Sequence, residues 1–185
     1  MRFLFIFLFI LSFSSFSLAG KLRGVELPDT IELDGKKLLL NGMGIRKATI
    51  LRIKAYVAGL YIEKKSSDRA AISAMKGPKR IELTMLMTLE KDQLTKAWND
   101  SVLKHCPSDC SSLQKALGTL NSYMRAVKRK QKLIIDVIDN KTIVTIRGTQ
   151  KNPIESADLT AAILKVFIGP KEVDEGMAEG LLGKE

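Results

Sequence analysis

A positively charged residue lies within an otherwise apolar, strand-like part of the chain, and this feature limits the possible folds most strongly. Residues 40–46 read LNGMGIR, so Arg46 follows two closely spaced glycines, and residues 54–62 form a second run rich in apolar and aromatic side chains. Such residues favour strands, and an arginine among them needs a partner for its charge. The pattern predicts neighbouring strands, with an anionic ligand as one candidate partner of Arg46. The alternative is that Arg46 caps a helix end or pairs with an acidic side chain of the protein.

The first residues have the composition of a cleaved signal peptide. Arg2 precedes an unbroken apolar run at residues 3–11, and residues 17–19 place small side chains where a signal peptidase reads them. The alternative is a membrane anchor, but a spanning helix needs roughly 20 apolar residues and this run is shorter. We therefore expect residues 1–19 to be removed before Gly20 and the protein to be periplasmic or secreted. By length, residues 20–185 then form a single domain.

The chain contains two cysteines, Cys106 and Cys110, separated by three residues. In an oxidising compartment a close pair predicts a disulfide. A redox-active pair normally has the tighter C-x-x-C spacing, and a zinc site needs more ligands than the single histidine, His105, can add. We expect a structural disulfide that ties the loop between two helices.

The protein is basic, with a formal net charge of +10, and most of its cations are dispersed. Five of them form a cluster: Arg125, Lys128, Arg129, Lys130 and Lys132. One interpretation is a solvated helix end, where cations also favour the negative end of the helix dipole. The other is a surface for anionic lipid headgroups or polysaccharide. Nucleic acid is not an expected partner, because no binding motif for it is recognised.

No cofactor is expected from the residue pattern. The sequence shows no metal-ligand cluster, no glycine-rich phosphate loop and no pairing of a nucleophile with a histidine. The oligomeric state is not indicated.

The periodicity of apolar residues predicts an α+β fold. Asp34-Gly35 between two strand-like segments predicts a hairpin, because both central residues of such a turn take φ > 0, and a second turn is expected at Asn41-Gly42. The predicted strands are residues 25–33, 36–40, 45–51, 53–62, 81–87, 133–138 and 142–146, and the predicted helices are 68–75, 90–105, 111–128, 159–167 and 173–181. This order indicates an antiparallel sheet with helices on one face.

Several ordered motifs resemble the chalcone isomerase superfamily. Residues 42–46 (GMGIR) resemble its G-x-G-x-R motif, and residues 54–61 (KAYVAGLY) resemble its K-x-[YT]-x-x-G-x-Y strand. Residues 159–170 are similar to its penultimate helix with the I-G stop, and residues 181–183 to the closing L-L-G of bacterial members. The resemblance implies an exported bacterial chalcone isomerase-like protein. It also implies an open-faced β-sandwich, in which a large antiparallel sheet is backed by helices with a ligand cleft between them.

The resemblance implies roles for three residues. Arg46 matches the cleft arginine, which contacts the reacting group in the enzymes and the carboxylate in fatty-acid-binding relatives. Tyr56 matches a position held by a threonine in plant enzymes and a tyrosine in fatty-acid-binding relatives. Thr160 matches a cleft-facing hydroxyl that adjusts specificity. Its alternative is a helix hydroxyl bonded to its own backbone.

The chain departs from the plant active site at three places. Residues 91–96 lack the tyrosine found early in that helix, residues 81–87 lack the strand lysine, and Asp100 or Ser101 stands near the catalytic asparagine. Each lost donor at a developing charge typically costs about 10²–10³ in rate. Plant-type catalysis is therefore disfavoured, so no catalytic residue is assigned; Arg46 and Thr160 would serve only in an isomerase.

Three hypotheses follow. The favoured one is a binding protein for a fatty acid or similar amphipathic carboxylate, with Arg46 and Tyr56 at the head group. In it, apolar strand residues would line the tail: Leu83, Met85 and Met87. The second is an intramolecular lyase of chalcone isomerase type. The third is an envelope interaction module that uses the basic cluster.

Overall fold

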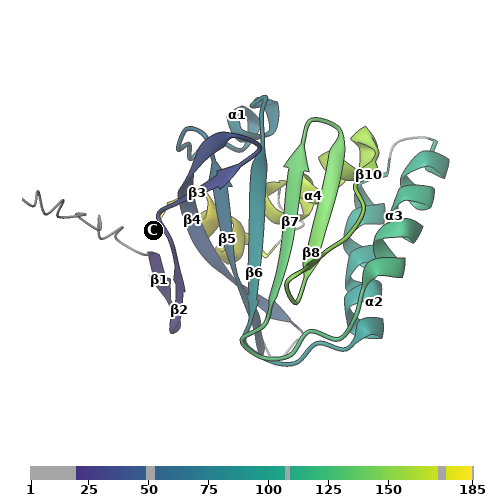
Figure 1. Ribbon diagram of the computed structural model, residues 1–185, viewed down its shortest axis with the longest axis horizontal. Helices are drawn as coiled ribbons and strands as arrows, with labels where there is room; N and C mark the ends of the chain where they lie inside the picture. Colours follow the sequence, from purple (N-terminus) through teal and green to yellow (C-terminus); the bar gives the residue numbers. More distant parts are fainter. Residues whose placement is uncertain (1–19, 49–52, 107–108, 171–173, 185) are drawn as a thin grey trace, which may run out of the picture.

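The computed structural model describes residues 20–48, 53–106, 109–170 and 174–184, and its centre is a curved antiparallel sheet (Figure 1). The strands of the chain are β1 (Gly20–Leu22), β2 (Val25–Leu27), β3 (Thr30–Leu33), β4 (Lys36–Ala48), β5 (Ile53–Ile62), β6 (Lys79–Met85), β7 (Lys132–Ile138), β8 (Lys141–Ile146), β9 (Thr149–Gln150) and β10 (Ile154–Glu155). Along the sheet the order is β10-β8-β7-β6-β5-β4-β3, with β9 paired to β8, while β1 and β2 form a separate hairpin.

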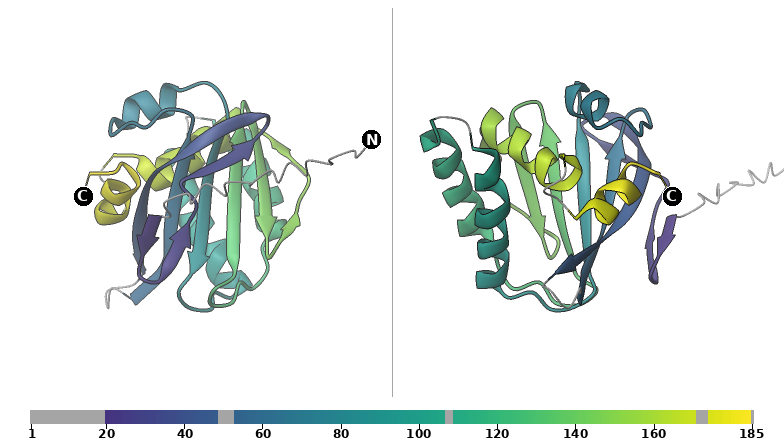
Figure 2. Two further views of the ribbon diagram at one scale, coloured as in Figure 1. Left: turned by 60° about the vertical axis from the view of Figure 1, so that its left-hand side comes forward. Right: turned by 180° about the vertical axis from the view of Figure 1, so that it is seen from behind.

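The helices lie on one face of this sheet (Figures 1 and 2). They are α1 (Arg69–Ala74), α2 (Lys91–Val102), the short 3-10 helix η1 (Leu103–His105), α3 (Ser111–Tyr123), α4 (Ala157–Ile168) and α5 (Glu175–Leu181). The predicted α+β fold, an open-faced β-sandwich with helices backing an antiparallel sheet, is confirmed. None of the helices in the described ranges is long and apolar enough to cross a membrane.

The expected turn at Asn41-Gly42 is wrong, because β4 runs through these residues without interruption. The register between β4 and β5 shifts there, which is a β-bulge at Asn41. The Asn41 side chain donates to the Leu181 carbonyl oxygen at 2.7 Å and exchanges hydrogen bonds with the backbone of Ser66 at 2.8 and 3.0 Å. These bonds to distant segments satisfy the bulged residue, so the strand continues.

The predicted hairpin at Asp34-Gly35 is present between β3 and β4. Asp34 has φ 52° and Gly35 φ 68°, as this kind of turn requires. The single strand predicted at residues 25–33 is instead two, because Pro28 stands between β2 and β3 and provides no backbone N–H. Of the strand predicted at 45–51, residues 49–51 lie outside the described residues, as does the predicted leader at 1–19.

Helix α3 ends at Tyr123, five residues before the predicted end. Met124 is already extended, and Val127 pairs with Leu89 through two backbone hydrogen bonds of 2.9 Å. Met124 and Val127 are both buried in the main core, so the apolar periodicity of the sequence continues past the end of the helix. The basic cluster therefore lies mainly in the connection from α3 to β7, and only Arg125 bonds to the helix end, through the carbonyl oxygens of Ser122 and Met124.

Two apolar clusters hold the layers together. The larger lies between the sheet and the helices and includes Leu60, Leu83, Trp98 and Phe167. The smaller lies on the opposite face, beneath the β1–β2 hairpin (Figure 2). It includes Leu27 of that hairpin together with Leu38, Leu40, Val57 and Tyr61 of β4 and β5. Each strand thus contributes alternate residues to the two faces.

Farther along that opposite face, charged side chains are paired. Arg80 donates two hydrogen bonds to the Asp136 carboxylate, at 2.6 and 2.7 Å. Lys132 lies 2.6 Å from the Glu82 carboxylate. These pairs explain how carboxylates of low exposure are tolerated on β6 and β7.

Candidate functional site

A cavity of about 460 Å³ lies between β4, β5 and β6 and the helices α2, α4 and α5. Its polar lining residues are Arg46, Lys47, Tyr56, Gln93, Lys96, Asp100 and Ser101. Its other lining residues are Ile53, Ala55, Leu83, Met87, Leu89, Leu94, Ala97, Trp98, Leu133, Val166, Phe167 and Met177. The wall is thus largely apolar with a few polar groups, which is typical of small-molecule sites.

The glycines before Arg46 allow a helix to seat on β4. A Cβ on Gly42 would overlap the backbone around Gly180, and a Cβ on Gly44 would overlap the carbonyl of Met177. Gly42, Gly44 and Arg46 alternate along the strand and so share one face. Helix α5 covers the two glycines, and Arg46 is the next residue on that face, beyond the covered part, where it lines the cavity.

A second β-bulge shapes the cavity wall. Arg46 is opposite Tyr56 in the register, but Lys47 is opposite Lys54, so Ala55 is the extra residue. The bulge interrupts the alternation of side chains, and the consecutive residues Ala55 and Tyr56 both line the cavity. Bulges often re-aim side chains beside functional sites in this way.

The structure brings Arg46 and Tyr56 together at the cavity, as the resemblance implied. In the described part of the chain, no carboxylate lies within ion-pair distance of the Arg46 guanidinium, and that group makes no hydrogen bond there. The described residues therefore leave the five donors of the Arg46 guanidinium without a side-chain or backbone acceptor.

Tyr56 is a neutral phenol at physiological pH. Burial raises its pKa to about 12; Arg46 opposes this rise and the Asp174 carboxylate adds to it. The side chain is half-buried, packs against the main core and lines the cavity. A protonated phenol can donate a hydrogen bond to an anion.

Asp174, the nearby acid, is engaged with backbone groups. Its carboxylate accepts a hydrogen bond from the Lys47 backbone N–H at 2.7 Å and another from Met177 N–H at 3.4 Å. The second bond caps α5 at its N-terminus. Asp174 thereby fixes α5 against β4 beside the cavity.

Aromatic residues of α2 and α4 form part of the cavity wall. The rings of Trp98 and Phe167 meet edge to face, with centroids 6.2 Å apart. Leu83 and Met87 also line this wall, whereas Met85 is fully buried and is not among the lining residues. Two of the three residues expected to line a ligand tail are thus at the cavity.

Thr160 lies away from the cavity, on α4. Its hydroxyl donates to the Ser156 carbonyl oxygen at 2.8 Å and lies 3.3 Å from the Thr142 hydroxyl, and the side chain is buried. The Thr160 hydroxyl is thus bonded to the backbone of its own helix, which is the alternative given above, and it does not line the cavity.

Sequence reasoning did not assign the polar residues of α2 to the ligand site. Gln93, Lys96, Asp100 and Ser101 follow one another at intervals of three, four and one residues and line the cavity. Lys96 and Asp100 pair at 2.7 Å. These polar residues lie at helical spacing beside the apolar stripe of Leu94 and Trp98, and that spacing is the sequence feature that could have placed them at the cavity.

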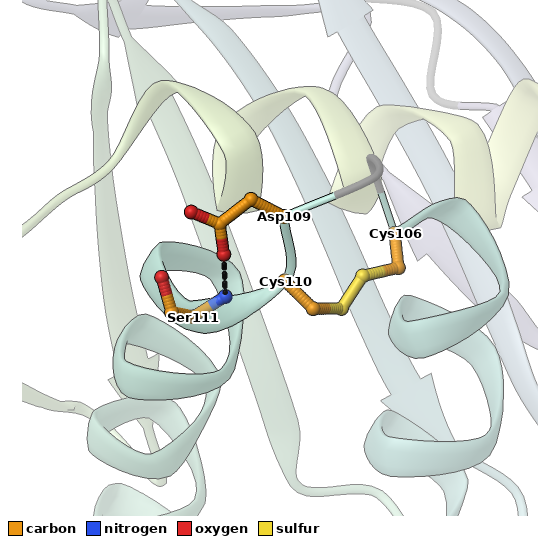
Figure 3. Close-up of a disulfide and its surroundings, with 4 residues drawn as sticks. All are labelled: Cys106, Asp109, Cys110 and Ser111. Atoms are coloured by element: carbon orange, nitrogen blue, oxygen red, sulfur yellow. Dashed lines mark hydrogen bonds between the residues drawn. A yellow bond between two sulfur atoms is a disulfide. The ribbon is translucent and has the colours of Figure 1, made fainter.

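Cys106 and Cys110 form a disulfide between η1 and α3 (Figure 3). Their Cα atoms are 5.6 Å apart, and the Asp109 carboxylate accepts a hydrogen bond from the Ser111 N–H at 3.0 Å. Neither cysteine lines the cavity. Among the described residues, no three His, Cys, Asp or Glu side chains are grouped as metal ligands would be.

The chain is similar to known proteins over nearly its whole length. The family model described as chalcone isomerase-like matches residues 19–183. The crystal structure of a fatty-acid binding protein from Arabidopsis thaliana superposes with a TM-score of 0.73 and 19% sequence identity, covering 91% of this chain and 96% of that chain. A comparison with curated proteins found no match. The family match, together with the shared fold, shows that the chain belongs to the chalcone isomerase-like family.

Proposed function

We propose that this protein binds a fatty acid or a similar amphipathic carboxylate in the cavity, without plant-type catalysis. The observation that carries the proposal is that Arg46 and Tyr56, opposite each other on β4 and β5, line one largely apolar cavity. A cation and a neutral phenol match a carboxylate head, and the apolar wall matches a hydrocarbon tail.

The size of the cavity supports a small lipid. A volume of about 460 Å³ lies within the range of roughly 300–1,000 Å³ that is typical of ligand pockets. Met87 and Met177 contribute flexible, polarisable surface, which suits irregular apolar ligands.

The head-group chemistry favours a carboxylate. A guanidinium binds a carboxylate through two parallel N–H bonds, and such charge-assisted bonds are roughly twice as strong as neutral ones. The phenol of Tyr56 adds a neutral donor. The fatty-acid binding protein of Arabidopsis thaliana shares this fold, which supports the same class of ligand here.

We expect no chalcone cyclisation above background. The part of α2 that lines the cavity presents Gln93, Lys96, Asp100 and Ser101 and no tyrosine. Addition of purified protein to a 2′-hydroxychalcone, followed by its absorbance, tests this. Acceleration that disappears in Arg46→Ala would favour an isomerase of chalcone isomerase type instead.

Binding is tested by titrating delipidated protein with hexadecanoate and by native mass spectrometry. Arg46→Ala is expected to weaken binding by about 10- to 150-fold, since a hydrogen bond to a charged group contributes about 1.5–3 kcal/mol. Arg129→Ala, which removes an equal charge from an exposed site outside the cavity, is the matched control and is expected to bind as the wild type does. Equal affinity of Arg46→Ala and the wild type would contradict the proposal.

We also propose that the protein is exported. Residues 1–19 have the pattern of a cleaved signal peptide, and a disulfide persists best in an oxidising compartment. Intact-mass measurement of protein recovered from the periplasm is expected to give a chain that begins at Gly20. A full-length chain recovered from the cytoplasm would rule out export.

A further inference from the structure

The connection from α3 to β7 runs along the edge of the cavity. Leu89 and Val127 exchange two backbone hydrogen bonds of 2.9 Å, and the Lys130 N–H donates to the Met85 carbonyl oxygen at 2.8 Å. Met87 and Leu89, on the segment held by these bonds, line the cavity. The two segments lie side by side along the lower edge of Figure 1.

This connection carries a concentrated positive charge. Arg125, Lys128, Arg129 and Lys130, which we call the basic loop, are exposed, and no Asp or Glu occurs between residues 124 and 132. Lys132 is excluded from the loop because it pairs with Glu82.

The carboxylates of the adjacent helix leave this charge largely uncompensated. Glu90 and Asp92 at the start of α2 are exposed and have Lys91 between them, while Asp100 is paired with Lys96. The described residues give no ion pair between a carboxylate and the basic loop.

An exposed apolar side chain lies at the same cavity. Ile53, at the start of β5, is 45% exposed and also lines the cavity. The nearby ends of β4 and β5 carry Lys47 and Lys54, which oppose each other in the register. Cations around an exposed apolar residue are the elements of a peripheral membrane surface.

We infer that this end of the molecule docks on a bilayer that contains anionic phospholipid, so that the cavity faces the membrane. Each Lys or Arg near an anionic bilayer surface raises the affinity of the protein for that surface about fivefold. This attraction falls off within a Debye length of the surface. One isoleucine adds little, so the docking is reversible and sensitive to salt. The inference rests on the proposed function for its purpose, because docking would let a fatty acid pass between bilayer and cavity.

The test is cosedimentation with vesicles of phosphatidylcholine alone and of phosphatidylcholine mixed with phosphatidylglycerol. The variant Lys128→Gln/Arg129→Gln/Lys130→Gln removes three cations of the basic loop and keeps Arg125, which bonds to the end of α3. The matched control is Lys37→Gln/Lys64→Gln/Lys65→Gln, three exposed cations at the other end of β4 and β5.

Wild type is expected to prefer the mixed vesicles and to lose this preference in high salt. The basic-loop variant is expected to bind them about 10²-fold more weakly, and the control less than about tenfold more weakly. Ile53→Ser is expected to lower affinity a few-fold, since the side chain inserts only shallowly. Equal losses in the two triple variants, or no preference of wild type for anionic vesicles, would overturn the inference.

Hexadecanoate binding in solution separates this inference from the proposed function. The basic-loop variant is expected to retain wild-type affinity for hexadecanoate, which also shows that it is folded. Wild type that docks on vesicles but binds no hexadecanoate would support the docking and contradict the proposed function. Wild type that binds hexadecanoate but ignores vesicle charge would overturn the docking alone.

Discussion

Arg46 and Tyr56 are register partners across β4 and β5 and line the same cavity. The bulge immediately beyond them makes Ala55 the extra residue and ends the simple alternation of the strands. Two features therefore place the cation: glycines of β4 that admit α5, and a bulge in β5 that shapes the wall beside it.

Replacing the Tyr56 phenol tests its part in head-group binding. Tyr56→Phe removes one neutral donor but keeps the ring, so hexadecanoate affinity is expected to fall by about two- to tenfold, in line with roughly 0.5–1.5 kcal/mol per hydrogen bond. Titration calorimetry measures the change. A variant that binds as tightly as wild type would show that the phenol does not contact the carboxylate.

The raised pKa of Tyr56 predicts a loss of stability in alkali. The folded pKa is about 12 and the ordinary value is 10.0, so the folded state holds this proton more firmly. The contribution is fully present below pH 10 and disappears as pH rises toward 12, a change of roughly 2–3 kcal/mol in the free energy of unfolding. Burial raises the pKa of Tyr61 as well, so part of the alkaline loss has a second source.

Urea unfolding at about pH 9 and about pH 11, in wild type and Tyr56→Phe, isolates this effect. Wild type is expected to lose more free energy between the two pH values than the variant does. Parallel losses would mean that Tyr56 ionises as it does in the unfolded chain.

Alanine is expected to have opposite effects at two glycines, Gly44 under α5 and Gly118 on the exposed side of α3. Gly44→Ala would push a Cβ into the Met177 carbonyl and is expected to destabilise the protein by about 2 kcal/mol or more. Gly118→Ala, at an exposed site of α3 with open space around it, is the control and is expected to stabilise by about 0.5–1 kcal/mol. Thermal unfolding of both variants measures this, and a neutral Gly44→Ala would argue against the close approach.

Displacement of α5 should also weaken ligand binding. Met177 lines the cavity and Asp174 fixes the start of the same helix, so Gly44→Ala is expected to weaken hexadecanoate binding while Gly118→Ala leaves it unchanged.

The disulfide is expected to contribute stability without affecting the ligand. Closing so short a loop is worth about 2 kcal/mol by chain entropy, so Cys106→Ser/Cys110→Ser should unfold at correspondingly lower urea. Reductant should lower the stability of wild type to that of the variant and leave the variant unchanged. Hexadecanoate affinity should not change, because neither cysteine lines the cavity.

Local features of the sequence determined much of the architecture. The hairpin at Asp34-Gly35 follows from the φ > 0 that such turns need, and α1 begins after Asp68, whose carboxylate accepts from the N–H groups of Ala70 and Ala71. Apolar periodicity located the five α-helices of the described residues and the strands β5, β6, β7 and β8, but it divided β4 in two. The ordered motifs around Arg46 and Tyr56 indicated the family.

Only the tertiary structure decided the details of the site. Asn41 keeps β4 continuous through a bond to Leu181, 140 residues away, and Thr160 bonds to Ser156 instead of lining the cavity. Val127 leaves the helical pattern to pair with Leu89, which holds the basic loop beside the segment that lines the cavity. Periodicity and backbone preference act over a few residues, whereas a cavity, a bulge and a charged rim arise where distant segments pack, and no local pattern specifies which segments those are.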